Sequence, residues 1–350
     1  MKHPLFSLQD FSLNNTIKMQ WRPIPDEQII QDTPFALDVQ KMGLLILAGG
    51  DGARLGFKGP KGCFPLPLPQ RPTLFQLLFE KIKQQGSDLS VAVMTSSNND
   101  GETKTYLKKF HYFGLNPNYI DIFQQGDIPL CDQKGEMFFA SPGKLAKGGD
   151  GNGRAFFYFR ENGLDQKWLK RGIEVIQVIP VDNPLCQPFD MRLLTLHETR
   201  KVDIVIQAIQ REDPKEALGV LGLVNHKLHI AEYSELTAHQ ALSKHDYPLG
   251  YSGIFSCFLN FAQKGAELSL DLPWHIARKR AKQWHQRGDH WEMQEMTSCK
   301  FETFIFDLFP YAQSHLIHLI QRESSFAPLK ERTGENAPEA VAQKVQRYFL

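Results

Sequence analysis

A glycine-rich stretch followed by two cations is the part of this sequence whose residue types point most directly to chemistry. It contains Gly49, Gly50, Gly52, Arg54 and Lys61. Glycines carry no Cβ atom and adopt positive φ, so several backbone N–H groups can converge on one anion. The planar guanidinium and the compact ammonium group add charge that suits phosphoryl oxygens. This combination predicts a site for a nucleoside triphosphate.

Two better-known phosphate motifs do not fit this stretch. A Walker A loop needs glycine and lysine followed by serine or threonine, and that triplet does not occur here. A dinucleotide fingerprint needs a third glycine where Leu55 stands. A tight turn with two solvated cations is the plain alternative, and the close succession of Arg-Leu-Gly and Pro-Lys-Gly disfavours it.

Two other predicted strand ends carry polar residues suited to the same ligand. Gln125 follows the predicted strand 119–123, and its amide offers a donor and an acceptor to the edge of a base. Asp182 follows the apolar run 173–181, where a carboxylate can hold Mg2+ against phosphate oxygens. A solvent-exposed turn glutamine and a turn carboxylate before Pro184 are the plain alternatives.

The segment 147–153 is rich in glycine, and Asn152 within it has a glycine on each side. It resembles half of a calcium loop, but no glutamate stands at the twelfth position, so we reject a calcium site. We expect an irregular loop that lies closely against a polar ligand such as a sugar.

The hydrophobic pattern predicts a scaffold that brings these loops together. Apolar runs predict strands at 44–47, 91–95, 119–123 and 173–181, separated by helices, the first of which is capped by Thr73. This alternation predicts an α/β fold with a doubly wound, mixed but mostly parallel sheet and helices on both faces. Ligands of such sheets bind outside the carboxyl ends of the strands, where the loops converge.

After about residue 200 the sequence no longer alternates between predicted strands and helices. Short β segments at 203–210, 218–224 and 228–233 predict hairpins that extend the sheet. The remaining predicted elements are helices at 262–290 and 300–309, a strand at 316–321 and a last helix at 338–350. We expect three parts, namely a helical or irregular lead-in at 1–40, a catalytic domain at 41–325 and a C-terminal segment at 326–350.

Composition excludes several function classes. The 350 residues include 42% hydrophobic residues, and the net charge is +1, so no broad positive field exists to hold nucleic acid or a membrane surface. Five cysteines without a C-x-x-C pair predict reduced thiols and no zinc site. No apolar run reaches transmembrane length and the N-terminus has no signal sequence, so we expect a cytoplasmic protein. The sequence gives no oligomeric state.

Several motifs together resemble one family. The stretch 47–56 (LAGGDGARLG) with 60–62 (PKG) is similar to the nucleotide loop of the UDP-N-acetylglucosamine pyrophosphorylases, in the wider UDP-sugar pyrophosphorylase family. Further matches follow in the family's order at 73–76 (TLFQ), 111–115 (HYFGL), 123–126 (FQQG), 150–153 (DGNG), 181–183 (VDN), 232–235 (EYSE), 304–307 (FIFD) and 326–330 (FAPLK). The resemblance covers about residues 44 to 330.

The resemblance implies a Rossmann-like, GT-A-like nucleotide-diphospho-sugar transferase core and assigns roles by matched position. The positions implied to bind the nucleotide are Gly49, Gly50, Gly52, Gln125 and Gly151. Those implied to contact the sugar are Asn152, Glu232 and Gly253. Asp182 matches the aspartate that holds Mg2+, and the catalytic cations match Arg54, Lys61 and Lys330. The C-terminal segment that carries Lys330 is expected to close over the site.

Three departures from the family pattern bear on specificity. Ala53 replaces a threonine of the nucleotide loop, and Arg154 replaces a glycine beside Asn152. Gly253 stands where the family has an asparagine that contacts the sugar. N-acetylglucosamine 1-phosphate is therefore the favoured substrate, while N-acetylgalactosamine, glucose and galactose 1-phosphates stay open.

The implied reaction joins UTP and a sugar 1-phosphate to give a UDP-sugar and pyrophosphate. A phosphate oxygen of the sugar 1-phosphate attacks the α-phosphorus of UTP without a general base, because that oxygen is already ionised. A nicotinamide-dependent oxidoreductase would need an acidic residue at the end of the strand 91–95, and none stands there. A catalytically inactive nucleotide-sugar-binding protein stays open as the other alternative.

Overall fold

The architecture is taken from a computed structural model that describes His3, Leu5 and residues 21–32, 38–214, 216–232, 244–287 and 289–349. Eleven strands of the described residues form one sheet, in which eight strands follow the path β2-β17-β11-β14-β10-β3-β4-β5. In that order they are Ile29–Ile30, His315–Leu319, Ile204–Gln210, Leu249–Phe258, Val175–Pro180, Met42–Leu47, Val91–Thr95 and Ile120–Gln124. The other three are Trp21–Arg22 (β1), Val220–Val224 (β12) and Lys227–Ala231 (β13).

The sheet is mixed in direction. β3 pairs in parallel with β10 and β4, and β4 with β5. β11 and β17 are parallel, as are β17 and β2, whereas β14 runs antiparallel to both β10 and β11. Because β3, β4, β5 and β10 point the same way, the loops that follow them leave from one edge of the sheet.

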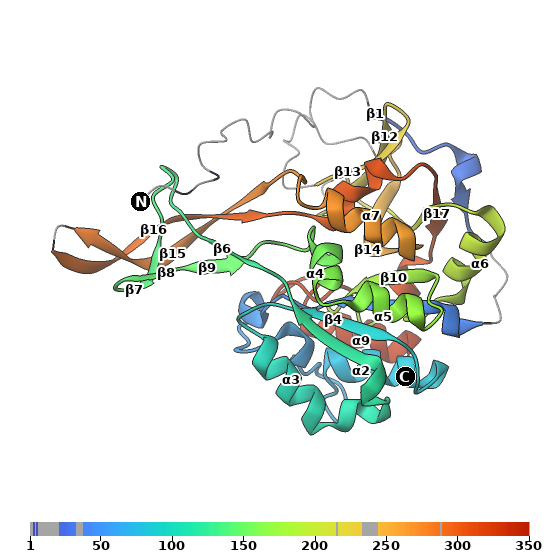
Figure 1. Cartoon of the computed structure of the whole chain (residues 1–350), viewed down its shortest axis with the longest axis horizontal. Helices are drawn as coiled ribbons and strands as arrows, with labels where there is room; N and C mark the ends of the chain where they lie inside the picture. The colour runs from blue at the N-terminus through green and yellow to red at the C-terminus, as the bar shows by residue number, and fades with distance from the viewer. Residues whose placement is uncertain are drawn as a thin grey trace.

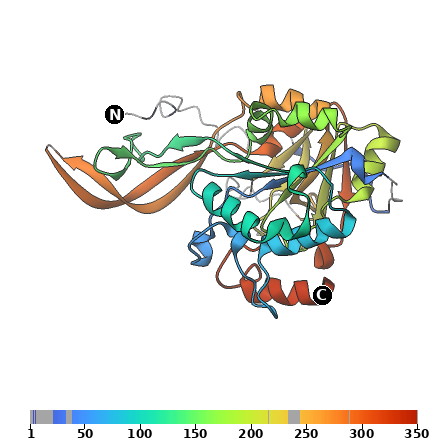
Figure 2. The same cartoon turned by 60° about the horizontal axis from the view of Figure 1, so that its bottom comes forward.

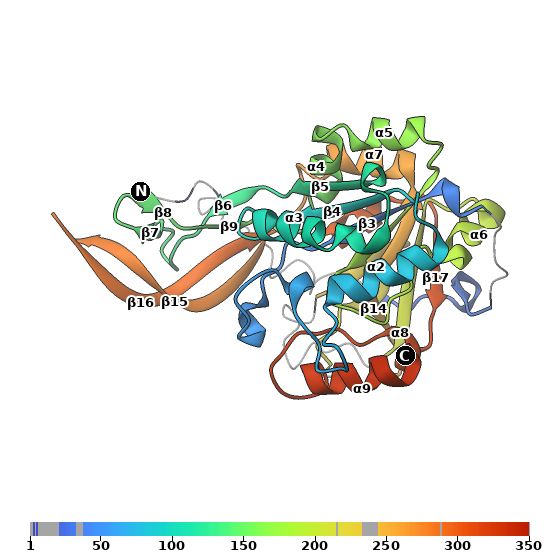
Figure 3. The ribbon, with the colours of Figure 1, turned by 90° about the horizontal axis from the view of Figure 1, so that it is seen from below.

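Helices cover both faces of this sheet (Figures 1 and 3). Leu45 of β3 packs in one core with the helices α4 (Ala155–Glu161), α5 (Leu164–Lys170) and α7 (Leu259–Leu268). Its neighbours Leu44 and Ile46 pack on the other face with α2 (Leu74–Gln85), α3 (Asp100–Lys109) and α6 (Met191–Arg200). Successive residues of a strand point to opposite faces, so a strand buried on both sides has to be apolar throughout.

Helix α2 forms as the sequence predicts and links the sheet to the C-terminal segment. Its N-cap Thr73 accepts a hydrogen bond from the backbone N–H of Gln76 (3.2 Å), and Gly86 follows its last residue. Leu78 packs toward the sheet, whereas Leu74 packs in a cluster with Leu329 and residues of the last helix, α9 (Pro338–Tyr348). The short helix α8 (Arg322–Ser325) precedes this segment.

The prediction of a charged helix over residues 262–290 is wrong beyond α7. The chain instead forms a long antiparallel hairpin of β15 (His275–Arg287) and β16 (His290–Glu302), which projects from the body of the molecule (Figures 1 and 2). Lysine, arginine and glutamine favour helices in isolation, but here cross-strand pairing determines the structure. Arg280 of β15 pairs with Glu295 of β16 (3.2 Å).

Two further predictions need correction. Residues 300–302 belong to β16 rather than to an aromatic helix, and the segment Ile305–Tyr311 is a 3-10 helix that contains Pro310. The segment 147–153 is not wholly irregular, because β9 (Lys147–Gly149) pairs with β6 (Asp127–Pro129). The short strands β7 (Phe139–Ser141) and β8 (Lys144–Leu145) lie beside the hairpin.

The described part of the lead-in contains two short strands, of which β1 pairs with β12 and β2 with β17, and the 3-10 helix Asp26–Gln28 between them. The other predicted strands and helices lie within a few residues of their expected bounds. Within the described ranges, none of the helices combines the length and the apolar character that a membrane crossing requires.

His197 of α6 is a neutral histidine that lies in the core and faces β14. Nδ1 of His197 donates to the carbonyl oxygen of Val202 (2.8 Å), so Nε2 accepts from the hydroxyl of Ser256 (2.8 Å). Burial lowers the pKa of His197 from 6.5 to about 4, against the opposing effect of these hydrogen bonds. The histidine is therefore a structural residue rather than a ligand.

Candidate active site

The glycine loop after β3 is closed by its own backbone hydrogen bonds. Lys61 N–H donates to the carbonyl oxygen of Gly50 (3.1 Å), and Gly52 N–H donates to that of Gly59 (3.0 Å). Gly56 has φ +73, which a glycine adopts without strain. The loop therefore has a defined shape in which Gly50 and Arg54 are exposed.

A buried asparagine fixes this loop to the next strand end. The Asn99 amide donates to the carbonyl oxygens of Ala48 (3.1 Å) and Gly50 (3.2 Å), and its oxygen accepts from Ser96 N–H (2.9 Å). The sequence marked Asn99 only as part of a polar turn. Its position shows that the turn after β4 holds the glycine loop in place.

Gln125 lies in a slot between two glycines. A Cβ atom on Gly49 would lie 2.7 Å from Oε1 of Gln125, and one on Gly149 would lie 1.7 Å from its Nε2. No other residue type fits at Gly149 unless Gln125 moves. The two loops thus orient the Gln125 amide beside the glycine loop, as a base-recognising group would require.

The loop 150–153 is fastened to the segment that follows the hairpin. Thr303 N–H donates to the carbonyl oxygen of Asp150 (2.8 Å), and Gly153 N–H donates to that of Thr303 (2.9 Å). Gly151 has φ +89, and a Cβ atom there would lie 2.2 Å from the Thr303 oxygen. The Asn152 side-chain oxygen accepts from Ile305 N–H (2.9 Å). Gly151 and Asn152 are therefore held rigidly.

Asp150 is a buried carboxylate in the same loop. The Tyr158 hydroxyl donates to its Oδ2 (2.5 Å), while Oδ1 has no hydrogen-bond partner among the described residues. Burial raises the pKa of Asp150, and the Tyr158 hydrogen bond opposes this shift. Gly126 leaves room for the pair, because a Cβ atom there would lie 2.0 Å from the Tyr158 oxygen.

An ion pair joins the glycine loop to the end of β10. Nζ of Lys61 lies 3.1 Å from Oδ2 of Asp182, and the two side chains are only 18% and 20% exposed. These residues stand more than a hundred positions apart in the sequence, so the sheet brings them together. A cation and a carboxylate are thereby placed next to each other beside the glycine loop.

The C-terminal segment is anchored to the same turn. Leu329 N–H donates to the backbone oxygen of Asp182 (2.8 Å). The fully buried Asn183 donates to the carbonyl oxygen of Ser325 (2.9 Å) and accepts from Ala327 N–H (3.0 Å). Lys330 therefore directly follows a residue whose backbone is bonded to Asp182.

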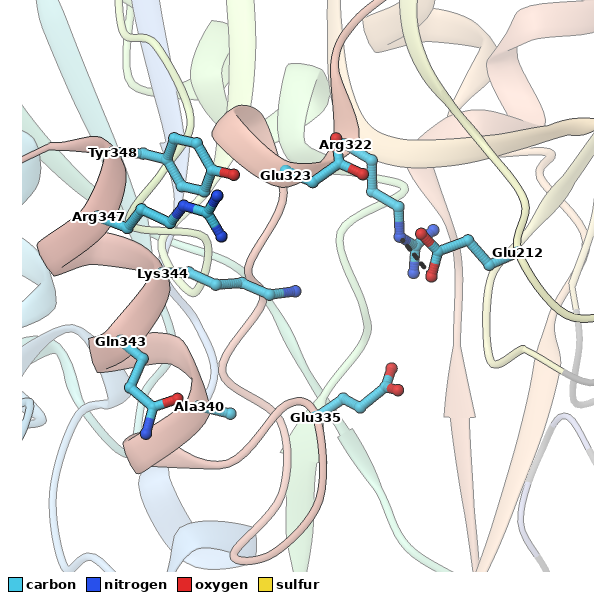
Figure 4. A pocket seen from close by; sticks show the side chains of 9 residues that line it. All are labelled: Glu212, Arg322, Glu323, Glu335, Ala340, Gln343, Lys344, Arg347 and Tyr348. Carbon is cyan, nitrogen blue, oxygen red and sulfur yellow. Dashed lines mark ion pairs between the residues drawn. The ribbon is translucent and has the colours of Figure 1, made fainter.

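A hollow of about 520 Å³ lies beside α8 and α9 (Figure 4). Its lining consists of Glu212, Arg322, Glu323, Glu335, Ala340, Gln343, Lys344, Arg347 and Tyr348. None of the sequence-predicted site residues is among them. Three cations and three carboxylates balance each other there, and Arg322 is paired with Glu212 (Figure 4). The hollow therefore shows no preference for an anionic nucleotide.

Comparison with known proteins identifies the family. The family model described as UTP–glucose-1-phosphate uridylyltransferase matches residues 8–248. This chain belongs to that family.

Relatives of the family agree with this membership. A Schizosaccharomyces pombe protein described as a UDP-N-acetylglucosamine pyrophosphorylase is 32% identical over 313 residues, which cover 82% of this chain and 65% of the relative. The chain therefore spans slightly less than two thirds of that relative's length.

Solved structures of the same kind have a similar fold. An Entamoeba histolytica protein described as a UDP-N-acetylglucosamine pyrophosphorylase has a TM-score of 0.79 at 28% identity, covering 88% of this chain and 81% of the other. The Trypanosoma brucei enzyme, solved with an inhibitor, has a TM-score of 0.75 at 25% identity, covering 88% and 66%. The mixed α/β fold described above is thus that of UDP-sugar pyrophosphorylase structures.

Position 253, where the resemblance predicts an asparagine, has a local structural reason to be glycine. Gly253 lies at an irregularity where the register between β11 and β14 shifts, and its φ is +85. A Cβ atom there would lie 3.3 Å from Cγ of Pro180, the last residue of β10. Gly253 thus lies next to the turn of Asp182 but presents no side chain.

Glu232 follows β13, with Oε2 3.9 Å from a Cβ atom placed on Gly219.

Asp182 is the candidate metal ligand of this site. No group of three or more His, Cys, Asp or Glu side chains suited to a metal occurs in the described part of the chain. Asp182 is a partly buried oxygen donor next to the predicted phosphate site, and Mg2+ is often held by one or two carboxylates together with phosphate oxygens. Asp182 fits a magnesium ion that is held partly by phosphate oxygens. The described residues do not provide a magnesium site built from protein ligands alone.

Proposed function

We propose that this chain transfers a uridylyl group from UTP to a sugar 1-phosphate, most readily N-acetylglucosamine 1-phosphate, and releases pyrophosphate. The observation that carries the proposal is the Lys61–Asp182 ion pair at 3.1 Å, which joins the glycine loop to the end of β10. The slot that holds Gln125 between Gly49 and Gly149 supports it, because it places an amide beside the same loop. The names of the relatives favour the N-acetylated sugar.

Each group in the site has a role in this reaction. The backbone around Gly49, Gly50 and Gly52 would receive the nucleotide, and Gln125 would read the edge of the uracil. A phosphate oxygen of the sugar 1-phosphate then forms a bond to the α-phosphorus of UTP. The bond from that phosphorus to the β-bridging oxygen breaks, and its electron pair leaves with pyrophosphate. Binding and orientation supply most of the catalysis.

The cations stabilise the charge that moves in this step. Lys61 and Lys330 would neutralise charge on the phosphoryl oxygens around the α-phosphorus, and Arg54 would act on the leaving group. We propose that Asp182 would hold Mg2+ together with phosphate oxygens. Such an ion supplies charge neutralisation to the transferring phosphoryl group.

The sugar would lie against the loop that carries Gly151 and Asn152. The Asn152 oxygen is occupied by Ile305 N–H, so its amide N–H groups are left for a ligand. Glu232 would accept hydrogen bonds from sugar hydroxyls. We further propose that the core is Rossmann-like and GT-A-like, that the segment 326–350 closes over the bound substrates, and that the protein acts in the cytoplasm, where its free thiols would stay reduced.

A single assay tests this proposal. Pyrophosphate release is measured with UTP, Mg2+ and each of four sugar 1-phosphates, those of N-acetylglucosamine, N-acetylgalactosamine, glucose and galactose. The highest kcat/KM is expected for N-acetylglucosamine 1-phosphate, and a chelator should abolish turnover. Preference for glucose or galactose 1-phosphate would correct the sugar. Release from none of them, together with tight binding of a UDP-sugar, would support the inactive binding protein instead.

A further inference from the structure

A lysine is buried on the side of α2 that packs toward the C-terminal helix. Lys81 is only 5% exposed. It stands one helical turn after Leu77, which packs in a cluster with Val341 of α9. A charged group in such surroundings is costly unless it is hydrogen-bonded, so the partners of this lysine indicate what it does.

The ammonium group of Lys81 joins three parts of the chain. Its Nζ donates to the backbone oxygens of Pro184 (2.7 Å) and Cys186 (3.0 Å), in the turn 182–186 after β10. It also lies 4.5 Å from the ring centroid of Phe349, which directly follows α9. Desolvation by burial lowers the pKa of Lys81, and no carboxylate of the described residues is paired with it. Backbone dipoles and one aromatic face therefore take the place of a counter-ion.

The turn that this lysine holds is the one that carries Asp182. Leu329 N–H donates to the backbone oxygen of Asp182 (2.8 Å), and Ala327 N–H donates to the side-chain oxygen of Asn183 (3.0 Å). These bonds attach to the turn the segment that carries Lys330. The buried lysine is bonded to the same turn at its last residues, so Asp182 and the segment after α8 rest on a common support.

The helix α2 also supports the glycine loop. A Cβ atom on Gly62 would lie 2.2 Å from the ring of Phe75, so the backbone next to Lys61 packs directly on α2. The helix thus contacts the loop through Phe75 and the turn through Lys81. These are the two segments that the ion pair joins. Their relative position matters for chemistry, because a displacement of about 1 Å can lower a reaction rate about 100-fold.

We propose that Lys81 is a positioning residue for the transfer reaction, which holds Asp182 and Lys330 in place through the turn 182–186. This inference rests on the proposed function, which assigns those two side chains to the phosphates and their metal ion. Because Lys81 is buried, it acts through the turn rather than on the substrates. Phe349 covers its ammonium group, so the docking of α9 and the position of the turn depend on each other.

Replacing Lys81 by methionine keeps the stem of the side chain and removes both hydrogen bonds. We expect kcat for pyrophosphate release to fall about 10- to 100-fold, while the KM values of UTP and the sugar 1-phosphate change by about threefold at most. Lys81→Arg, which can donate to the same two oxygens and stack on Phe349, should restore part of kcat.

Hydrogen exchange measured by mass spectrometry without substrates gives a readout that is independent of turnover. In Lys81→Met, exchange should be about tenfold faster in peptides that cover 182–186 and 326–330, whose amides are bonded within or to the turn. Exchange in β3 and β4 should stay unchanged. The comparison separates a local loss of position from a general loss of stability.

Lys83→Met is the matched control, because Lys83 is an exposed lysine of the same helix. Its loss should leave kcat and exchange unchanged. Thermal unfolding midpoints would verify that each variant is folded. If Lys81→Met does not fold, Phe349→Leu decides instead, since it removes only the aromatic face over the ammonium. It should lower kcat and accelerate exchange of the turn by about threefold each, and unchanged values would overturn the inference.

The remaining outcomes are distinct. A folded Lys81→Met with the kcat and the exchange of the wild type would overturn the inference and leave the proposed function in place. Faster exchange throughout the chain, or a lower kcat without faster exchange of the turn, would also overturn it, because the lysine would then not act by holding the turn. If the wild type releases pyrophosphate with none of the four sugar 1-phosphates, the proposed function is wrong and the inference falls with it.

Discussion

Replacing Lys61 by alanine tests the ion pair on which the proposed chemistry depends. Lys61 Nζ lies 3.1 Å from Asp182 in a partly buried position. At an effective dielectric constant of about 20, a full charge about 4 Å from a phosphoryl oxygen contributes about 4 kcal/mol before desolvation is subtracted. Removing one such preorganised partner raises a reaction barrier by about 2–4 kcal/mol, so kcat/KM should fall roughly 30- to 1000-fold.

The assay is continuous detection of pyrophosphate at saturating Mg2+, with UTP and N-acetylglucosamine 1-phosphate varied in turn. Lys58→Ala is the control, because Lys58 is an exposed cation of the same loop. It should keep activity within about threefold of the wild type. The fold should survive in both variants, with unfolding midpoints shifted by about 3 °C at most. Near-wild-type turnover of Lys61→Ala would remove Lys61 from the reaction and refute this reasoning.

Three other predictions follow from single positions. Gly149→Ala places a methyl group 1.7 Å from the Gln125 amide, so the dissociation constant of UTP should rise about tenfold while the melting temperature changes little; unchanged affinity would exclude Gln125 from uracil binding. Gly253→Asn restores the residue that the resemblance predicts to contact the sugar, and asparagine tolerates the φ of +85 better than most residues. It should raise the ratio of kcat/KM for N-acetylglucosamine 1-phosphate over glucose 1-phosphate severalfold, and an unchanged ratio would contradict this role. Because the pKa of His197 falls from 6.5 to about 4 on folding, the protein should lose up to about 3 kcal/mol of unfolding free energy as the pH falls from about 6.5 through 4. Urea unfolding of the wild type and His197→Gln across this range measures the effect, and equal pH dependence of the two proteins would refute it.

The convergence of the glycine loop, Gln125 and Asp182 could be predicted from the sequence because its signals are local. The strand before the glycine loop is apolar throughout, and Thr73 caps the helix that follows. Lys61 and Asp182 each end up beside the same sheet edge because parallel strands place their following loops there. Gln125 was also recognisable, although the two glycines that confine it come from different loops.

The hairpin could not be predicted because its stability comes from pairing rather than from propensity. The residues of β15 are mostly lysine, arginine and glutamine, which favour a helix when no partner is considered. Their partners on β16 are reached only across the turn, so the pattern within either strand is not decisive. The helix prediction over 262–290 therefore could not indicate which residues of the hairpin face each other. Asn99 and Asn183 were missed for the same reason, because their partners lie far away in the sequence.

The central claim is that a uridine nucleotide lies in the cradle formed by the glycine loop, Gln125 and the Lys61–Asp182 pair. A crystal structure of the protein with UTP or UDP-N-acetylglucosamine tests it most directly. We predict density for the uracil against Gln125 and for the phosphates next to Lys61, with the ion pair opened. Density for the nucleotide in the hollow beside α8 and α9, with the cradle empty, would contradict the account.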